Sequence, residues 1–476
     1  MLEVLLFSNG EIRLINHETE VLIKRELDQA KKASIVIGVV TKDEKFITGT
    51  IYDDLGSVAI GDCVFEIGST TKTFTSLLLS KLILNNTIAL DEPLSNYKPE
   101  YRRALTYNGK EVTFRHLSTH RSRFPREDMK TIRQRMKEHK DEKDNPYKYF
   151  SQDDLHQFFI DFDLKKEIDQ KWGYSNIGVG LLGNILAEIV GLSYEEAIKK
   201  EILNPFGMND TFINGTPEQY ERYIKSYNKK EIRIPPIELP AINGAGALKS
   251  TMNDMLLYLE HQMGLKDSPL KEAIDFTQQV HAKTGSKQLD MGLGWFIEKK
   301  KWCDDPIIHH GGTTMGFHTY CGFIKEKQVG IVICSTIQLK MVRLIKMLLH
   351  LSGMVNENIA EQLFKRFLNE EQVNRLRKGD SKMTKSQKNL RTCDKGHNYY
   401  KSSDCPTCPI CENMRKPENG FLSLLSAPAR RALENNGISS LEQLSTYSES
   451  EILKFHGMGP ASLPKLKNAL QEKGFI

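Results

Sequence analysis

The sequence lacks a long hydrophobic run of the kind that crosses a membrane or directs secretion. Its first apolar stretch, residues 4–7, is interrupted by Ser8, Asn9 and Gly10, whereas a membrane helix needs roughly 20 consecutive apolar residues. We therefore expect a cytoplasmic protein with no membrane contact. With 476 residues and 39% hydrophobic content, the chain is long enough for two to four soluble domains, one with a substantial core.

The sequence also lacks the spread of cysteines that is typical of a disulfide-bonded protein. Of its eight cysteines, four lie between residues 393 and 411, and the others, Cys63, Cys303, Cys321 and Cys334, stand singly in apolar or strand-like segments. Metal ligands together with reduced core thiols explain this distribution better than disulfides do.

Charge of neither sign dominates the whole chain, whose net charge is +5, but one segment is distinctly basic. Residues 375–391 carry seven basic residues against Asp380 alone. This composition predicts a flexible basic linker, which we place at residues 366–391. A second charged run, residues 121–148, is expected to be a solvated insertion in the first domain.

Ser69 and Lys72 form the most informative pair in the chain, because they lie one helical turn apart where a helix is expected to begin. Gly68 suits the turn into that helix, and apolar residues then recur near the helical period at Phe74, Leu77, Leu78 and Leu82. In the first turn, unpaired N–H groups favour a developing oxyanion, and a desolvated lysine can act as a base. The pair therefore indicates a serine acyl-transfer enzyme, although Ser-x-x-Lys also occurs by chance in many helices.

Two further segments carry side chains that such a serine would need. Tyr174 and Asn176 form a Tyr-x-Asn triplet before an apolar, glycine-rich helix, where the phenol could take the serine proton and the amide could hold a substrate carbonyl. His310 opens a glycine-rich strand end at residues 310–316, followed by a charged turn and another strand. Glycines there would bring a backbone N–H close to the substrate. A structural tyrosine and a structural histidine are the alternatives.

Together these segments resemble the serine β-lactamase and penicillin-binding-protein-like hydrolases, in particular the class C-like branch that includes DD-peptidases, D-amino-acid amidases and esterases. The order Ser-x-x-Lys, Tyr-x-Asn and His-x-Gly is the signature of that family. Further similar segments follow in order at residues 115–120, 203–208, 244–251 and 292–295. The resemblance covers roughly residues 20–350.

The resemblance implies an α/β (α+β) fold, in which an antiparallel sheet has helices on both faces and a helical subdomain is inserted between strands. It also implies a set of site residues: Ser69, Lys72, Tyr174, His310, Asn176, Gly312 and Thr313. No cofactor is expected for catalysis.

Each of these residues takes a role from the resemblance. Ser69 would be the acylated nucleophile, Lys72 and Tyr174 would share the proton transfers, and Asn176 would orient the substrate. The N–H groups of Ser69 and Thr313 would form the oxyanion hole. His310 would occupy the third-motif position.

Two departures from the family pattern bear on the substrate. In penicillin-recognising members, a lysine and a threonine of the third motif hold the substrate carboxylate, but here His310 and Gly311 take those places. A neutral imidazole and a glycine should bind a β-lactam or a D-Ala-D-Ala terminus weakly. Arg123 also replaces a glycine that is common in relatives, which leaves the conformation of residues 119–125 open.

We therefore expect a serine hydrolase that cleaves a small ester or amide through an acyl intermediate on Ser69. β-Lactamase or DD-carboxypeptidase activity is one alternative, and a non-catalytic ligand-binding fold is the other. The tripeptide at residues 283–285, Lys-Thr-Gly, spells the usual third motif but precedes residues 292–295, which the family places ahead of that motif. We expect it to be a loop.

A compact group of metal-binding residue types follows the linker, at Cys393, His397, Cys405, Cys408 and Cys411. A Cys-x-x-Cys turn can hold one ion through two thiolates, and the upstream Cys-x-x-x-His pair can complete a tetrahedral set. We expect a structural zinc knuckle at residues 392–416. Five candidate residues are available for four ligand positions, so it stays open whether Cys405 or Cys411 is the one that does not bind the metal. Redox pairing of the cysteines is the alternative to metal binding.

Residues 417–476 predict short helices with a helix-hairpin-helix near residues 456–460, and they resemble the C-terminal domain of the bacterial RNA polymerase α subunit. Such hairpins can offer N–H groups to phosphates. Basic and acidic residues nearly balance here, so protein docking is expected at least as much as nucleic-acid binding. The expected hydrolase domain spans residues 1–365.

Overall fold

The computed structural model describes residues 17–28, 30, 32–140, 145–338, 355–378, 389–393, 395, 398–401, 411, 417, 420–455, 458–459 and 462–475. The chain divides into two compact units, Met1–Arg377 and Lys378–Ile476. Each unit has a hydrophobic core of its own.

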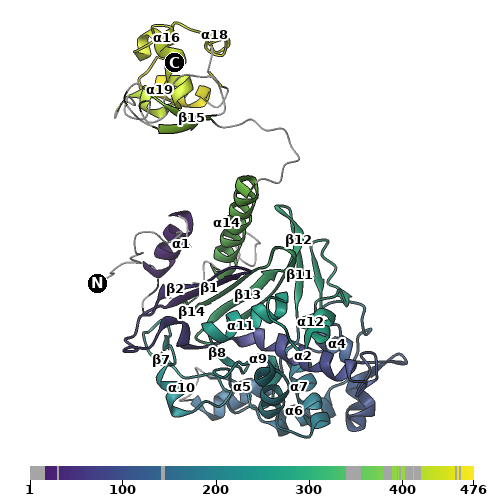
Figure 1. Ribbon diagram of the computed structural model, residues 1–476. Coiled ribbons are helices and arrows are strands. Elements are labelled where there is room, and N and C mark those ends of the chain that lie inside the picture. Colours follow the sequence, from purple (N-terminus) through teal and green to yellow (C-terminus); the bar gives the residue numbers. More distant parts are fainter. Residues whose placement is uncertain are drawn as a thin grey trace. The chain divides into compact units, whose positions relative to one another are not determined.

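An antiparallel sheet forms the centre of the first unit, and in the described part of the chain it has eight strands (Figure 1). Every pairing between its strands is antiparallel. From one edge to the other, the strands are β2 (Lys45–Thr50), β1 (Ile35–Thr41), β14 (Val329–Ser335), β13 (His318–Ile324), β12 (Cys303–Thr313), β11 (Phe296–Lys300), β10 (Leu289–Met291) and β9 (Ala282–Lys283).

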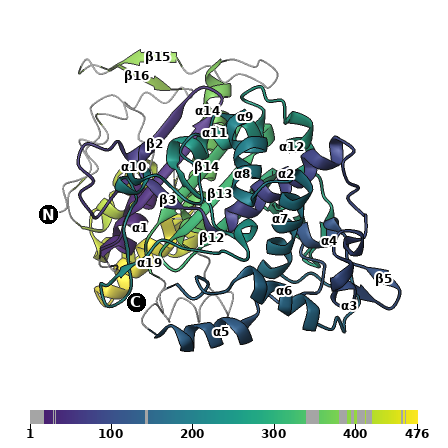
Figure 2. The ribbon, with the colours of Figure 1, turned by 90° about the horizontal axis from the view of Figure 1, so that it is seen from below.

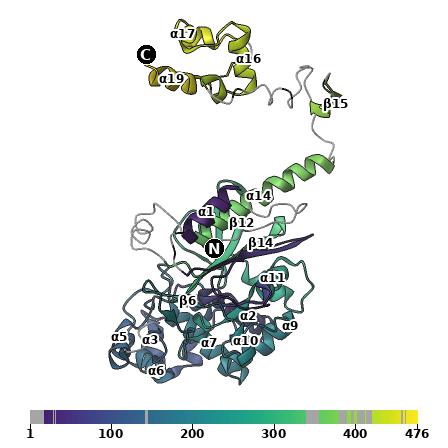
Figure 3. The ribbon, with the colours of Figure 1, turned by 90° about the vertical axis from the view of Figure 1, so that its left-hand side faces the viewer.

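Both faces of this sheet are buried, so its central strands are apolar at almost every position. Because side chains alternate between faces, Ile35 and Ile37 of β1 enter one core, whereas Val36 and Val40 enter the other. Helices α1 (His17–Asp28) and α14 (Val355–Lys378) lie side by side on the first face (Figure 3). The second core contains α2 (Thr71–Leu84), α7 (Asn176–Val190), α11 (Met252–Met263) and α12 (Lys271–Thr277).

A helical subdomain is inserted between two short strands that pair with each other, β3 (Val64–Glu66) and β8 (Lys249–Thr251). Besides α2 and α7, it contains α3 (Arg102–Leu105), α4 (Phe114–Ser118), α5 (Met129–Glu138), α6 (Gln152–Asp161), α8 (Tyr194–Ile198), α9 (Asn204–Phe206) and α10 (Pro217–Glu221). It also holds two small hairpins, β4 (Thr106–Tyr107) with β5 (Lys110–Glu111) and β6 (Ser226–Tyr227) with β7 (Arg233–Ile234). Helices α3, α5 and α6 lie together on one side of α7 (Figure 2). The predicted sheet, its helical covering and the inserted subdomain are therefore confirmed.

Helix α14 overlaps the linker that the sequence predicted from residue 366. The helix continues to Lys378, and Phe367 and Leu368 pack against the same core as Leu363 and Phe364. Apolar residues thus recur at helical spacing as far as Leu368, before the basic run that starts at Arg375. The boundary predicted after residue 365 thus falls inside a helix.

The second unit contains a short hairpin and, in its described part, four helices that enclose a small core. The hairpin joins β15 (Asn389–Thr392) and β16 (Asn398–Lys401), and the helices are α16 (Ala427–Asn435), α17 (Leu441–Ser445), α18 (Glu449–Ile452) and α19 (Leu463–Glu472). Leu433, Ile438, Leu444 and Leu466 are buried between them. Residues 456–457 and 460, in the predicted helix-hairpin-helix, lie outside the described residues.

Within the described residues, no single helix combines the length and apolarity needed to cross a bilayer. By length and composition alone, one bent pair passes that test, Asn176–Val190 with Tyr194–Phe206, at an angle of 74°.

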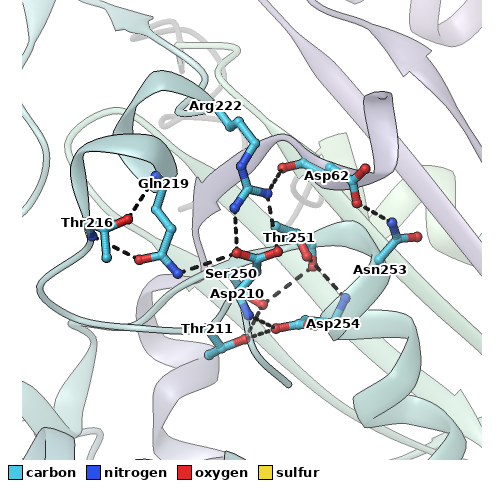
Figure 4. A network of polar contacts seen from close by, with 10 residues as sticks. All are labelled: Asp62, Asp210, Thr211, Thr216, Gln219, Arg222, Ser250, Thr251, Asn253 and Asp254. Carbon is cyan, nitrogen blue, oxygen red and sulfur yellow. Dashed lines mark hydrogen bonds and ion pairs between the residues drawn. The ribbon is translucent and has the colours of Figure 1, made fainter. Parts of the chain in front are cut away.

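A polar network ties the subdomain to the start of α11 (Figure 4). The buried carboxylate of Asp254 accepts hydrogen bonds from the Asp210 N–H at 2.9 Å and from the Thr211 hydroxyl at 2.8 Å. Arg222 pairs with Asp210 and donates to the Asp62 carbonyl at 2.8 Å. The network therefore joins the segment before β3 to the residues that follow β8, and so holds in place the strand that leads to Ser69.

Asp254 should make the stability of the first unit depend on pH. Burial raises the pKa of Asp254 to about 6, whereas an unfolded aspartate titrates near 3.9. The folded state then binds more protons between these values, so the free energy of unfolding should fall as pH rises from about 4 to about 6, by up to about 3 kcal/mol. Asp254→Asn should remove this fall in denaturant titrations across that range. The exposed Asp267→Asn control should keep it, and an unchanged pH dependence in Asp254→Asn would contradict the assignment.

Candidate active site

Ser69 lies in the turn that leads from β3 into α2. Residues Gly68–Thr70 form a 3-10 turn, η2, and α2 begins at Thr71. The serine therefore precedes the helix, whereas the sequence predicted it in the first helical turn. Gly68 has a φ of +50°, and a Cβ there would lie 2.9 Å from the Thr313 nitrogen. Glycine is thus required both for the turn and for the close approach of β12.

Lys72 places its amine beside the serine hydroxyl, inside the protein. The Lys72 Nζ atom lies 3.1 Å from Ser69 Oγ, 2.8 Å from Asn176 Oδ1 and 2.5 Å from the Ala245 carbonyl oxygen. The lysine is fully buried, whereas Ser69 is partly exposed. The pair predicted from the sequence is brought together, and its nucleophile can be reached from outside.

The contacts of Lys72 suit a neutral amine that acts as a base. Burial holds the pKa of Lys72 well below its usual value, and the positive charge of Arg126 lowers it further, whereas Glu127 opposes the shift. A neutral amine has two N–H groups and one lone pair. If the N–H groups point to Asn176 Oδ1 and the Ala245 carbonyl, the lone pair remains for the Ser69 hydroxyl proton.

Tyr174 completes the group around Ser69. Its ring centroid lies 5.0 Å from Lys72 Nζ. Desolvation raises the pKa of Tyr174 to about 12, while a hydrogen bond with Ser69 and the charge of Arg126 act to lower it. The phenol is therefore protonated at neutral pH and is placed to pass a proton to or from the serine oxygen.

Asn176 is held in one orientation by groups behind it. Its Nδ2 donates to Glu127 Oε1 at 3.0 Å, and the same oxygen accepts from the Tyr147 hydroxyl at 2.7 Å. A carboxylate accepts but cannot donate, so it fixes the amide with its oxygen toward Lys72. Glu127 is thus a positioning residue for the base.

The glycines of α7 bring the third contact of Lys72 into place. A Cβ on Gly183 would lie 3.0 Å from the Cα of Gly244, so helix and turn touch backbone to backbone. Gly244 belongs to the 3-10 turn η7 (Asn243–Ala245), whose last carbonyl accepts from Lys72. The glycines of this helix therefore allow it to pack closely against η7.

The end of β12 lies against the turn that carries Ser69. Gly312 has no room for a side chain, because a Cβ there would meet the Ile67 carbonyl. The Thr319 hydroxyl on β13 donates to that carbonyl at 3.0 Å and fastens the two segments together. The Thr313 nitrogen is consequently brought next to Gly68, as an oxyanion hole with the Ser69 N–H requires.

His310 points from β12 toward Tyr174, with 6.3 Å between the ring centroids. Its Nδ1 hydrogen bonds to the Gly311 carbonyl at 2.7 Å, so Nδ1 carries the proton and Nε2 is an acceptor. Burial and the nearby Lys72 lower the pKa of His310 to about 3. Nε2 is buried and has no partner in the described part of the chain. The imidazole is therefore neutral and cannot serve as a permanent cation.

A second histidine at the site was not predicted from the sequence. His120 Nδ1 accepts from the Ser175 N–H at 3.2 Å, and the ring lies 4.3 Å from that of Tyr174. Its φ of +59° and the φ of +70° at Arg123 are left-handed. The position of Arg123 is the one where relatives commonly carry glycine, so the loop keeps the conformation that glycine favours.

Residues 121–148 are not simply a solvated insertion. Arg133 and Lys137 are exposed as expected, but the Glu127 side chain is only 13% exposed and binds Asn176, and the Arg126 guanidinium lies 5.0 Å from the Tyr174 ring. The site role of Arg126 and Glu127 could have been predicted from their position, because they directly follow residues 119–125, a segment similar to the family pattern.

The Lys-Thr-Gly tripeptide at residues 283–285 begins on the edge strand of the sheet and not on β12, and only Thr284 and Gly285 lie in the expected loop. Lys283 ends β9, the edge strand three positions from β12, and pairs with Asp290 at 2.8 Å. The prediction that this tripeptide is not the third motif agrees with its place.

The predicted metal ligands are described only in part. Cys393 and Cys411 lie with their Sγ atoms 3.7 Å apart, whereas His397, Cys405 and Cys408 lie outside the described residues. Among the residues that the structure describes, no group of three or more metal-binding side chains converges.

Three of the four cysteines outside this cluster are core thiols, and the fourth, Cys303, is half-buried and also free of a disulfide. Cys63, Cys321 and Cys334 are buried without a disulfide, and burial raises the pKa of Cys63 to about 11. This agrees with the expected reduced thiols.

Comparison with protein families gives one match in this region: the Beta-lactamase family model matches residues 22–348. Among curated proteins, the D-alanyl-D-alanine-carboxypeptidase/endopeptidase AmpH of Escherichia coli strain K12 is 29% identical over 286 residues, which are 58% of this chain and 71% of that protein. A Beta-lactamase of the same strain is 25% identical over 344 residues, which are 64% of this chain and 84% of the relative.

Solved structures show the same fold at lower sequence identity. A class C beta lactamase from Rhodobacter sphaeroides superposes with a TM-score of 0.59 at 18% identity, over 74% of this chain and all of the other. A beta-lactamase/D-alanine carboxypeptidase from Pseudomonas syringae gives 0.56 at 20% identity, over 71% of this chain and all of the other.

Substitutions of Lys72 distinguish a role as a neutral base from a role as a permanent positive charge. Lys72→Arg keeps a cation but cannot supply a lone pair, so both Lys72→Arg and Lys72→Ala should slow the labelling of Ser69 by a fluorophosphonate by roughly 10²–10⁴-fold. The rate is measured by intact-protein mass spectrometry. Lys81→Arg, on the same helix, is the matched control and should label at the rate of the unaltered protein. Labelling of Lys72→Arg at that rate would contradict the role of Lys72 as a base.

Proposed function

Because this chain belongs to the Beta-lactamase family of serine hydrolases, we propose that it cleaves a small ester or amide through an acyl-enzyme intermediate on Ser69. The observation that carries the proposal is the buried Lys72 amine, 3.1 Å from the serine hydroxyl and bound to two further oxygen acceptors. Packing alone would not require a desolvated amine at this place.

The geometry supports a two-step reaction. Ser69 Oγ attacks the substrate carbonyl while its proton passes to the Lys72 amine, and the carbonyl oxygen becomes an oxyanion held by the N–H groups of Ser69 and Thr313. The tetrahedral intermediate expels the alcohol or amine, which takes the proton of the Tyr174 hydroxyl, while the Lys72 ammonium returns its proton to the Tyr174 oxygen. A water molecule then attacks the acyl-Ser69 ester as one of its protons passes to Lys72. The bond to Ser69 Oγ breaks, the serine oxygen takes that proton, and the carboxylic acid leaves.

The third motif favours substrates without a carboxylate on the leaving group. His310 is neutral because its pKa is lowered to about 3, and Gly311 carries no side chain. Neither residue can replace the lysine and threonine that hold the carboxylate in penicillin-recognising relatives. Two similar proteins are nevertheless named as a carboxypeptidase/endopeptidase and a beta-lactamase, so those activities are the second candidates.

A covalent adduct on Ser69 tests the proposal. Incubation with a fluorophosphonate should add one label per chain, located on Ser69 by peptide mass spectrometry, and 4-nitrophenyl butyrate should be hydrolysed. Ser69→Ala should lose both properties, because the nucleophile is absent. Folded protein with neither adduct nor turnover would favour the non-catalytic ligand-binding alternative. Faster turnover of a chromogenic cephalosporin than of the ester would favour the β-lactamase candidate.

For the second unit, we propose a structural zinc ion bound by cysteines of residues 392–416. Support comes from the 3.7 Å separation of Cys393 Sγ and Cys411 Sγ. Two thiolates on one tetrahedral zinc, each about 2.3 Å from the metal, would lie about 3.8 Å apart. This separation favours Cys411 over Cys405 as a ligand, with Cys408 and His397 as the other candidates.

Metal analysis of the full chain distinguishes the two uncertain cysteines. The purified protein should contain about one zinc per chain, since one tetrahedral site is proposed. Cys411→Ser should lose the metal, whereas Cys405→Ser, a matched change, should retain it, as measured by elemental mass spectrometry. The reverse result would make Cys405 the ligand, and a metal-free chain purified without chelator would contradict the site.

Protein docking or weak nucleic-acid binding by residues 375–476 stays a prediction of the sequence, as does a cytoplasmic location.

A further inference from the structure

Arg126 presents its guanidinium beside the catalytic group without engaging it in hydrogen bonds. Its side chain is 66% exposed, and its nearest charged neighbour, Glu127 Oε1, lies 3.7 Å away and already accepts from Asn176 and Tyr147. In the described part of the chain, no acceptor takes a hydrogen bond from this guanidinium. The Nε atom faces Glu127 at that distance, and the four N–H donors of the two terminal nitrogens remain available to a ligand.

The other arginines of the same loop are already engaged. Arg121 donates to Asp169 and to the Lys283 carbonyl, and Arg123 donates to the Lys171 carbonyl at 3.2 Å. Arg126 differs because its guanidinium carbon lies 5.0 Å from the centroid of the Tyr174 ring. Stacking on an aromatic ring orients a guanidinium while its donors stay accessible.

The backbone fixes where Arg126 lies relative to the reacting atoms. Its carbonyl accepts from the Asn176 N–H at 2.8 Å and from the Ile177 N–H at 3.3 Å, so the residue is tied to the start of α7. The third motif lies on a different element, β12, and its His310 contacts Tyr174 from there. Arg126 and the third motif thus approach the tyrosine from two separate segments.

The half of the substrate that Arg126 meets depends on where the leaving group binds. In β-lactams and D-Ala-D-Ala peptides the recognised carboxylate belongs to the leaving group, and the third motif holds it. Because the Arg126 carbonyl accepts from the Asn176 N–H, a substrate whose leaving group lies toward β12 and whose acyl group lies along Asn176 would also present that acyl group to Arg126. An anion on the acyl group would then meet a permanent cation, whereas an anion on the leaving group meets the neutral His310.

We propose that Arg126 forms an anion subsite for the acyl half of the substrate, so that the preferred substrates are esters or amides of dicarboxylic acids with one free carboxylate. This inference rests on the proposed hydrolase function and narrows its substrate class. A guanidinium and a carboxylate pair through two parallel hydrogen bonds, and the planar fork of arginine suits this geometry better than a lysine does.

A pair of esters with the same leaving group tests the subsite. Mono-4-nitrophenyl glutarate carries a carboxylate on its acyl group, and 4-nitrophenyl butyrate does not. The ratio of kcat/KM for glutarate over butyrate should fall about tenfold in Arg126→Ala, as expected for the loss of hydrogen bonds to a charged group. Arg126→Lys should restore part of the ratio, and raised salt should reduce it in the unaltered protein.

The matched control removes the same charge from the neighbouring helix. Arg133→Ala, on the exposed side of α5, should leave the ratio unchanged, because the described cations over the Tyr174 ring are Lys72 and Arg126. An equal loss for both esters in Arg126→Ala would indicate a structural role and overturn the proposal. So would an unchanged ratio in a protein that hydrolyses both esters.

A binding measurement keeps this proposal separate from the hydrolase function. In Ser69→Ala protein, calorimetry should detect glutaramate binding more tightly than butyramide, and the additional change Arg126→Ala should remove the difference. Selective binding without any turnover in the unaltered protein would overturn the proposed function but retain the subsite. Equal binding of the two amides would overturn the subsite, whatever the activity.

Discussion

The desolvation of the Lys72 amine is the constraint on which the site depends. An ammonium ion that is fully buried costs free energy, and the carbonyl oxygens of Asn176 and Ala245 accept hydrogen bonds from either protonation state. Desolvation therefore shifts the balance toward the neutral amine, whose lone pair faces Ser69. The positive charge of Arg126 shifts the balance in the same direction, and Glu127 limits the shift.

The fold supplies the partners of this amine from distant parts of the chain. Backbone contacts between glycines bring η7 against α7 and thereby deliver the Ala245 carbonyl. Glycines at 68 and 312 bring β12 against the serine turn. The sheet positions β12, and the polar network around Asp254 joins the segments that flank β3 and β8. The contacts at Gly68 and Gly312 leave no room for a Cβ, and the approach of Gly183 to Gly244 is tight, so backbone proximity holds these parts of the site together.

The catalytic residues that form a recognisable sequence motif could be predicted. The groups that position them could not, because their residue types and spacing form no such motif. Ser69 and Lys72 follow the helical period, so their proximity is a local property. The Ala245 carbonyl could not be predicted, because any residue offers one and only the tertiary fold selects it. Glu127 and Arg126 lie in a charged run that predicts exposure on composition alone. The extension of α14 was missed because the predicted linker was based on the basic run at residues 375–391, although apolar residues continue at helical spacing to Leu368.

The protonation state of Lys72 tests the central claim most directly. In protein labelled with ¹⁵N at lysine side chains, the Lys72 Nζ signal, assigned by its absence in a Lys72 variant, can be measured at pH 7 by NMR. The account predicts the chemical shift and two-proton multiplicity of a neutral amine, because burial lowers the pKa of Lys72 well below its usual value. A three-proton ammonium signal at that pH would contradict it.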